Sequence, residues 1–179
     1  MKSSARGKGL VQVYTGSGKG KTTAAWGQAL RAIGRGRKVA IVQFLKTPAT
    51  GERIAAQRLS PDLAVFGMSS PYDPSVDQQD SPVLREESRR NLQTARDLLA
   101  SGIWDMLVLD EINIVLHYGF VSEKEMLELL DSRPERTELV LTGRYAPDWL
   151  VEAADLVTEM REIKHPSAEG VKARTGIEY

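Results

Sequence analysis

Residues 16–22 (GSGKGKT) have the types and the spacing needed to bind a phosphate chain. Glycines let consecutive backbone N–H groups turn toward an anion, because no Cβ obstructs the approach. Lys21 adds a full positive charge, and Lys19 is a second cation within the segment. The hydroxyl of Thr22 is a suitable ligand for Mg²⁺. The segment therefore predicts a loop that binds the phosphate chain of a nucleotide.

The usual pattern of such loops is G-x-x-x-x-G-K-[ST], and this chain matches it only at its end. Thr15 occupies the first position, and the glycines stand at 16 and 18 instead. A glycine-rich turn without a ligand is the alternative. The apolar strand expected over residues 10–14 and the helix expected from Thr22 favour the phosphate loop, because its glycines normally join a strand to a helix N-terminus.

A second motif consists of two adjacent acids, Asp110 and Glu111, which follow the apolar segment 105–109 (DMLVL). Acids at the end of a buried strand are typical of a Walker B element, whose carboxylates hold Mg²⁺ directly or through water. The other interpretation is a helix N-cap. The order of a phosphate loop followed by this pair, in a chain of alternating strands and helices, favours the metal-binding role.

The elements that position these residues are predicted from hydrophobic runs. A nearly continuous apolar stretch at 38–45 is typical of a parallel strand covered on both faces, and residues 137–141 (TELVL) are predicted to form a further strand. Arg144 follows the second of these strands and is expected at the same sheet edge as the loop, where it can reach a polyphosphate. We predict one α/β domain over 10–179, of the P-loop NTPase-like (RecA-like) type with a mostly parallel sheet flanked by helices. We expect 1–9 to be a flexible arm.

Helical spacing predicts which side chains face the core. For the helix over 22–33 the expected core-facing residues are Ala25, Ala29, Leu30 and Ile33. Ser122 and Glu125 form a capping box at the start of another helix, whose expected apolar face is Met126, Leu127, Leu129 and Leu130.

Composition restricts the classes of partner. The chain has 24 Lys+Arg and 24 Asp+Glu, so no net field favours nucleic acid or a membrane surface. With no cysteine it has no disulfide or thiol nucleophile, which fits a cytoplasmic enzyme. No apolar run approaches the ~20 residues of a membrane span, and residues 1–9 are too polar for a signal peptide.

Further segments join the loop and the acids in one set: Gly51-Glu52-Arg53, Leu141-Thr142-Gly143-Arg144, Lys164-His165-Pro166 and residues 170–179 (GVKARTGIEY). With Gly-x-Gly-Lys-Gly-Lys-Thr-Thr-Ala-Ala at 16–25 and Leu109-Asp110-Glu111, this set resembles the ATP:corrinoid adenosyltransferases of the bacterial P-loop type. The likeness runs from about residue 8 to 179. It also accounts for Thr15, because the family's own loop begins Thr-Gly-x-Gly-Lys-Gly-Lys-Thr-Thr.

The resemblance implies transfer of the 5′-deoxyadenosyl group of ATP to the cobalt of a reduced corrinoid, with release of triphosphate. It implies ATP bound in the reverse sense to most P-loop enzymes, with its 5′-carbon toward the acceptor. Thr22 and Glu111 would hold Mg²⁺, and Lys21, Asp110, Glu111 and Arg144 would act in catalysis. The residues expected to contact the nucleotide are Thr15, Gly16, Ser17, Gly18, Lys19, Gly20, Lys21, Thr22, Thr23 and Arg31.

The resemblance also implies an apolar wall near the lower axial face of the corrinoid. Relatives carry a Gly-Phe-Thr-Trp-like sequence where this chain has residues 67–72 (GMSSPY), so Met68 and Tyr72 are expected to replace the aromatic pair. A homodimer and a flavin-type reductant protein are the implied partners.

Two other functions fit the residues. A P-loop ATPase or small-molecule kinase would use Glu111 to position water or an acceptor hydroxyl, and would form ADP. A corrinoid- or nucleotide-binding protein with weak turnover is favoured by the altered sequence at 67–72, and would bind without appreciable reaction.

Overall fold

One parallel sheet organises the molecule. The computed structural model describes residues 7–46, 50–67 and 81–177. Its strands lie in the order β3-β2-β4-β5-β1-β6, and every hydrogen-bonded pair among them is parallel. The strands are β1 (Val11–Thr15), β2 (Val39–Gln43), β3 (Leu63–Phe66), β4 (Met106–Asp110), β5 (Glu138–Thr142) and β6 (Leu156–Glu159). The predicted α/β fold with a parallel sheet is confirmed, and all carboxyl ends therefore meet at one edge.

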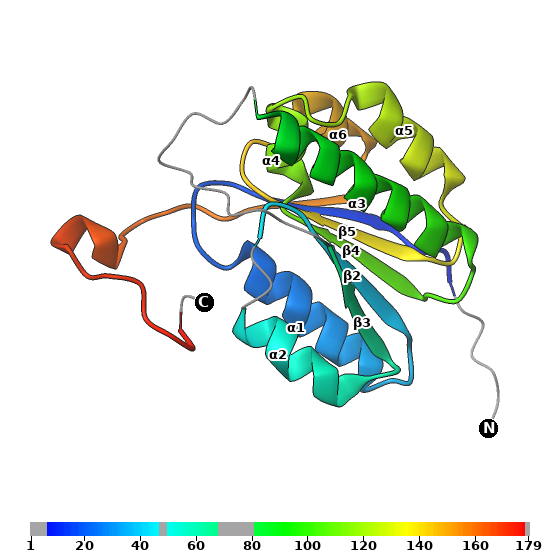
Figure 1. The fold of residues 1–179 in the computed structure, drawn as a ribbon, viewed down its shortest axis with the longest axis horizontal. Helices are drawn as coiled ribbons and strands as arrows, with labels where there is room; N and C mark the ends of the chain where they lie inside the picture. Colours follow the sequence, from blue (N-terminus) through cyan, green and yellow to red (C-terminus); the bar gives the residue numbers. More distant parts are fainter. Residues whose placement is uncertain (1–6, 47–49, 68–80, 178–179) are drawn as a thin grey trace.

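Helices cover both faces of the sheet (Figure 1). One face carries α1 (Lys21–Ile33) and α2 (Gly51–Ala56). The other carries α3 (Pro82–Ala100), α4 (Ile112–His117), α5 (Glu123–Ser132) and α6 (Asp148–Ala153). Two 3₁₀ segments, Gln57–Leu59 and Pro166–Glu169, complete the elements. Within the described ranges, no helix is long and apolar enough to cross a membrane.

The central strands β2 and β4 are buried along their whole length. Side chains alternate between the faces: Val39 and Ile41 pack toward α1, and Ala40 and Val42 pack toward α3. Burial on both sides explains the continuous apolar runs in the sequence. Polar side chains enter these strands only at their last residues, Gln43 and Asp110, both of which are buried. Polarity is thus concentrated at the carboxyl edge of the sheet.

Two predicted core residues are on the surface instead. Leu30 of α1 is 52% exposed, and Leu127 of α5 is 37% exposed. Helix α1 contacts the sheet through a narrower stripe of Ala25, Trp26, Ala29 and Ala32. Leu30 lies outside this buried stripe, so the prediction for Leu30 was wrong, as was that for Leu127.

Helix starts follow the sequence signals. The hydroxyl of Ser122 accepts a hydrogen bond from the Glu125 N–H at 3.3 Å, and the Glu125 carboxylate accepts one from the Ser122 N–H at 2.8 Å. This is the predicted capping box. In α3, Ser81 caps the first turn, and Glu86 and Arg90 form an ion pair at 3.0 Å.

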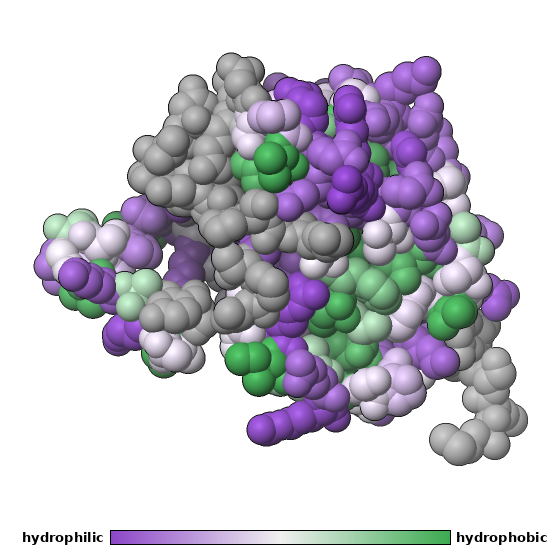
Figure 2. All heavy atoms as spheres, in the orientation of Figure 1, coloured by the Kyte–Doolittle hydropathy of each residue, from purple (hydrophilic) through white to green (hydrophobic). Residues whose placement is uncertain are grey.

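The segment that follows β6 extends away from the body of the molecule (Figure 1). All residues of β6 are exposed although the strand pairs with β1. Ile163 is 83% exposed, and Val171 and Ile177 are also on the surface. Figure 2 shows hydrophobic and hydrophilic residues mixed on this protruding segment.

Candidate nucleotide-binding site

Residues 16–20 form a tight loop between β1 and α1 at the carboxyl edge of the sheet. Gly16 and Gly20 have φ of 96° and 116°, a backbone region that side chains disfavour. A Cβ on Gly16 would lie 2.4 Å from the Met160 carbonyl oxygen. The Gly18 N–H donates to the same carbonyl at 2.7 Å. The loop therefore keeps its shape by packing against the end of β6, and only glycine fits at position 16.

The first turn of α1 is available to an anion. Gly20 is its N-cap, no side chain caps the helix, and the first turn contains no acidic residue. The backbone N–H groups of such a turn have no intrahelical partner, and the helix dipole adds partial positive charge. Loop and helix together thus present donors toward the space that a phosphate chain would occupy.

Lys21 lies within the loop rather than in solvent. Its Nζ donates to the carbonyl oxygens of Gly16 and Gly18, each at 2.7 Å, and the residue is only 8% exposed. Burial lowers the pKa of Lys21; Glu111 opposes this shift, while Arg144 and Lys46 add to it. The ammonium is therefore held where polyphosphate oxygens would satisfy it better than the loop carbonyls do.

The carboxylate of Asp110 is fully buried at the end of β4. It accepts hydrogen bonds from the hydroxyls of Thr22 at 2.9 Å and Thr142 at 2.7 Å. It also accepts one from the Lys46 ammonium at 2.7 Å. Asp110 thus ties the first turn of α1 to β5 and to the chain beyond β2. The Walker B prediction places this acid beside the loop, as observed.

Glu111 is held in an uncommon conformation. Its φ is 70°, and its N–H donates to the Thr142 hydroxyl at 3.0 Å. Its Oε2 is buried and has no hydrogen-bond partner among the described residues. Burial raises the pKa of Glu111, against the opposing charge of Lys46. A buried carboxylate oxygen without a partner in this part of the chain is a candidate ligand for a cation.

Lys46 is the site residue that the sequence did not single out. Leu45 has a φ of 53°, and the lysine that follows this turn lies over the acids. The Lys46 Nζ lies 2.6 Å from the Thr22 hydroxyl oxygen and 3.7 Å from the Glu111 Oε1. The available signal was a lysine at the end of the nearly continuous apolar run 38–45, close after the carboxyl end of β2. Local spacing does not reveal the residues across the sheet that it meets.

The other predicted residues lie at varying distance from this centre. Arg144 is exposed after β5, on a turn whose Gly143 carbonyl accepts a bond from Asn113 at 3.0 Å. Arg31 is exposed in the last turn of α1, about 15 Å along the helix from Lys21 at 1.5 Å per residue. Lys19 is exposed, and its Nζ donates to the Ile177 carbonyl at 3.2 Å. Direct nucleotide contacts by these three residues stay predictions.

Smaller groups complete the predicted set. The Thr15 hydroxyl accepts a bond from the Ala146 N–H at 3.2 Å, which links β1 to the turn after β5. Ser17, within the loop, and Thr23, in the first turn of α1, are both exposed. Met68 and Tyr72, predicted to contact the corrinoid, lie outside the described residues. The predicted arm, 1–9, is described only from residue 7, and the Gly9 N–H donates to the Glu135 carbonyl at 2.8 Å.

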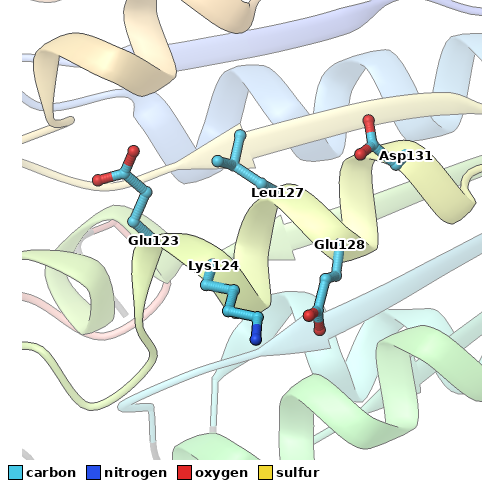
Figure 3. A pocket seen from close by; sticks show the side chains of 5 residues that line it. All are labelled: Glu123, Lys124, Leu127, Glu128 and Asp131. Carbon is cyan, nitrogen blue, oxygen red and sulfur yellow. The ribbon is translucent and has the colours of Figure 1, made fainter.

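A separate surface hollow of about 450 Å³ lies along α5 (Figure 3). It is lined by Glu123, Lys124, Leu127, Glu128 and Asp131. Glu123, Leu127 and Asp131 point to one side of the helix, and Lys124 and Glu128 to the other (Figure 3). All of these residues belong to α5, so this hollow is distinct from the glycine loop, and none of them was predicted to bind a ligand.

The parallel sheet, the glycine loop leading into α1 and the acids at the end of β4 define a P-loop nucleotide-binding protein. A family model described as ATP:corrinoid adenosyltransferase BtuR/CobO/CobP matches residues 7–179. The chain belongs to this family, as its motifs predicted.

Relatives cover nearly the whole chain. The corrinoid adenosyltransferase of Escherichia coli K12 is 38% identical over 173 residues, which are 96% of this chain and 86% of that protein. The corrinoid adenosyltransferase of a Sinorhizobium species is 40% identical over 177 residues, covering 96% and 81%. Corrinoid adenosyltransferase CobA of Salmonella typhimurium is 35% identical over 173 residues, covering 96% and 86%.

Proposed function

We propose that this protein transfers the 5′-deoxyadenosyl group of ATP to the cobalt of a reduced corrinoid, and releases triphosphate. The observation that carries the proposal is the family match across residues 7–179, which includes the loop and the acids described above. In this reaction the electron pair of Co(I) attacks C5′, a cobalt–carbon bond forms, and the C5′–oxygen bond breaks. The bonding pair leaves on the triphosphate.

The residues of the site suit this chemistry because the acceptor is already a strong nucleophile. No general base is needed, and the chain contains no cysteine that could serve as a protein nucleophile. The task left to the protein is to bind and stabilise a polyanionic leaving group. We assign this role to the N–H groups of 16–22 and to Lys21, which lies inside the loop. ATP would lie with its 5′-carbon toward the corrinoid, and Arg144 would contact the triphosphate.

The donor set at the end of β4 fits Mg²⁺. Hydroxyl and carboxylate oxygens are its preferred ligands, and the buried Oε2 of Glu111 lacks a hydrogen-bond partner among the described residues. We assign the metal to Thr22 and Glu111, with Asp110 orienting Thr22 through their hydrogen bond at 2.9 Å. Bound there, Mg²⁺ would supply charge neutralisation to the triphosphate.

The partners follow from the same proposal. A Co(I) corrinoid must be made by one-electron reduction, for which a flavin-type reductant protein in the cytoplasm is the expected donor.

We also propose a homodimer, supported by exposed apolar residues on β6 and beyond, including Leu156, Val157 and Ile163. Analytical ultracentrifugation would test the dimer, and a monomer across the micromolar range would contradict it.

The test of the activity is an incubation with ATP, Mg²⁺ and chemically reduced cobalamin. The expected products are triphosphate and a light-sensitive cobalt–carbon compound in equal amounts. Formation of ADP would instead support a kinase or ATPase, and binding without product would support a carrier.

The matched variants in this assay are Lys21→Ala and Lys124→Ala. Removing the Lys21 ammonium should lower turnover by about a hundredfold or more, since a single donor at a developing oxyanion contributes on the order of 10²–10³. Lys124 is an exposed residue of α5 outside the site, so its substitution should leave the rate unchanged. Equal rates for Lys21→Ala and the unmodified protein would show that the phosphates bind elsewhere.

A further inference from the structure

The Lys46 ammonium occupies the centre of the group of oxygens assigned above to the metal. Its Nζ is 2.6 Å from the Thr22 hydroxyl oxygen, 2.7 Å from the Asp110 Oδ2 and 3.7 Å from the Glu111 Oε1. Its side chain is 20% exposed, whereas that of Asp110 is fully buried. A cation is therefore already in place among these oxygens.

A metal ion bound to the Thr22 hydroxyl oxygen would lie close to the Lys46 ammonium, because one of the two lone pairs of this oxygen already accepts a hydrogen bond from Lys46. It donates its hydrogen to the Asp110 Oδ1 at 2.9 Å, and it accepts a hydrogen bond from Lys46 through a lone pair. A magnesium ion needs an oxygen lone pair at about 2.0–2.1 Å. An ion so close to the present position of Nζ would also meet strong charge repulsion. Lys46 and the metal thus compete for Thr22.

The surrounding charges show what Lys46 balances. Asp110 and Glu111 are two adjacent acids, and the nearest other cations are Lys21, held by the loop carbonyls, and the exposed Arg144. Lys46 is the cation that contacts Asp110 directly within the described residues. The Oε2 of Glu111 lies in the same cluster and has no hydrogen-bond partner within the described ranges, so the acids keep capacity for a second positive charge.

We infer that Lys46 is a built-in counter-cation that holds Thr22 and Asp110 in position before nucleotide binds, and that it yields Thr22 to the divalent metal when metal–ATP enters. Lys46 keeps Asp110 and turns its remaining donors to the triphosphate oxygens. It is a positioning residue, and its role rests on the proposed function only in taking the ligand to be metal–ATP. Because of this competition between Lys46 and the metal, the site binds a metal–nucleotide complex in preference to a free metal ion.

The decisive measurement is Mn²⁺ binding, followed by electron paramagnetic resonance without nucleotide or corrinoid. Lys46→Met removes the competing charge but retains the length of the side chain. It should bind MnCl₂ on the order of tenfold more tightly than the unmodified protein. Lys46→Arg keeps the positive charge and should bind MnCl₂ as weakly as the unmodified protein does. Lys124→Met on α5 should also bind MnCl₂ with the affinity of the unmodified protein. The titration with ATP described next separates this role from a simple loss of positive charge, which would strengthen Mn²⁺ binding with and without nucleotide.

The same variants are then titrated with Mn²⁺ and ATP together. With ATP present, Lys46→Met should no longer bind the metal more tightly than the unmodified protein. Its affinity for Mn²⁺–ATP should be the lower of the two, because the missing ammonium no longer contacts the phosphates. If folded Lys46→Met binds MnCl₂ no more tightly than the unmodified protein, the inference is wrong. These titrations need no corrinoid, so failure of adenosyl transfer and failure of the Lys46 role are separate outcomes.

A measurement on the native sequence covers the case in which Lys46→Met does not fold. Lysines are labelled by reductive ¹³C-methylation, and the Lys46 resonance is assigned by its loss in Lys46→Arg. The inference requires this resonance to move on addition of Mg²⁺ with ATP and to stay in place with MgCl₂ alone. A Lys46 resonance that is unaffected by Mg²⁺ with ATP would overturn it.

Discussion

Two residues at the site are held in arrangements that cost free energy. The Lys21 ammonium is buried against two carbonyl oxygens, and Glu111 combines a φ of 70° with a buried oxygen that has no hydrogen-bond partner among the described residues. Such features cost stability and persist only where the surrounding structure enforces them. Here the hydrogen bonds of Asp110 to Thr22 and Thr142 supply that constraint.

The lowered pKa of Lys21 predicts that ATP binding takes up protons as the solution becomes alkaline. Burial, the largest cause, lowers this pKa from its ordinary value of 10.5, and phosphate oxygens would raise it again because they favour the ammonium. Affinity for ATP should be constant well below the lowered pKa and should fall as pH rises through it. Calorimetric titrations in buffers of different ionisation enthalpy measure the proton uptake. Affinity that stays constant up to pH 10.5 would contradict the assignment.

At the scale of elements, the glycine loop depends on β6, which follows it by more than a hundred residues in the chain. Gly16 packs against the backbone of Met160, and Gly18 packs against the backbone of Met160 and Arg161, directly after β6. The loop is therefore shaped by a strand at the sheet edge as well as by its own sequence. Register between β1 and β6, which pairs Thr15 with Glu159, sets this contact.

Gly18→Ala is predicted to destabilise the protein by about 1–3 kcal/mol, as other overpacked sites do. The new Cβ would lie 2.8 Å from the Arg161 carbonyl carbon and oxygen, which are backbone atoms and cannot turn aside. Gly27→Ala is the matched control, since nothing lies within 4 Å of its added Cβ. That substitution within α1 should instead stabilise by about 0.5–1 kcal/mol. Urea unfolding of both variants measures the difference.

The capping box of α5 predicts a stability difference that depends on pH. The Glu125 pKa is lowered because its carboxylate accepts hydrogen bonds from the Ser122 hydroxyl and then from the Ser122 N–H. A lowered pKa in the folded state means that the stabilisation is present above the ordinary value of 4.5 and is lost as pH falls through the folded value. Glu125→Gln should therefore be less stable than the unmodified protein at pH 7, and the two should converge in acid. A constant gap across this range in urea unfolding would contradict the role of the charge.

Considered as a whole, the molecule joins both of its layers at the nucleotide site. The loop and α1 belong to one face of the sheet, and α4 begins beside Glu111 on the other. A ligand at the carboxyl edge would contact both layers and bind the folded state only. Its binding energy would therefore add directly to the global stability.

Thermal unfolding should show this linkage. With free Mg²⁺–ATP at a hundred times its dissociation constant, the gain is about 2.7 kcal/mol, which corresponds to a rise in Tm of about 5–10 °C for a chain of this size. Lys21→Ala, which lacks the ammonium within the loop, should show almost no rise at the same concentration. An equal rise in the two proteins, followed by circular dichroism, would place the nucleotide away from the loop.

The local features of this protein were predictable from its sequence. The strands expected over 10–14, 38–45 and 137–141 and the helix expected over 22–33 lie within one or two residues of β1, β2, β5 and α1. For β2 the signal is its burial on both faces, which makes a parallel strand continuously apolar. The loop and the acids Asp110 and Glu111 were recognisable from residue types at fixed spacing. Their meeting at one edge follows from the parallel order of the strands, which brings all carboxyl ends to the same side.

Tertiary structure decided what depends on neighbours distant in the chain. Leu30 and Leu127 fit a helical stripe yet lie on the surface, because packing against the sheet selects one of several possible stripes. Lys46 lies at the site because β2 pairs with β4 and because Leu45, which precedes the lysine, has a φ of 53°. The sequence by itself determined the chemistry available at the sheet edge. The fold decided which side chains share the same oxygens, since contacts across a sheet depend on strand order and register, which local spacing does not encode.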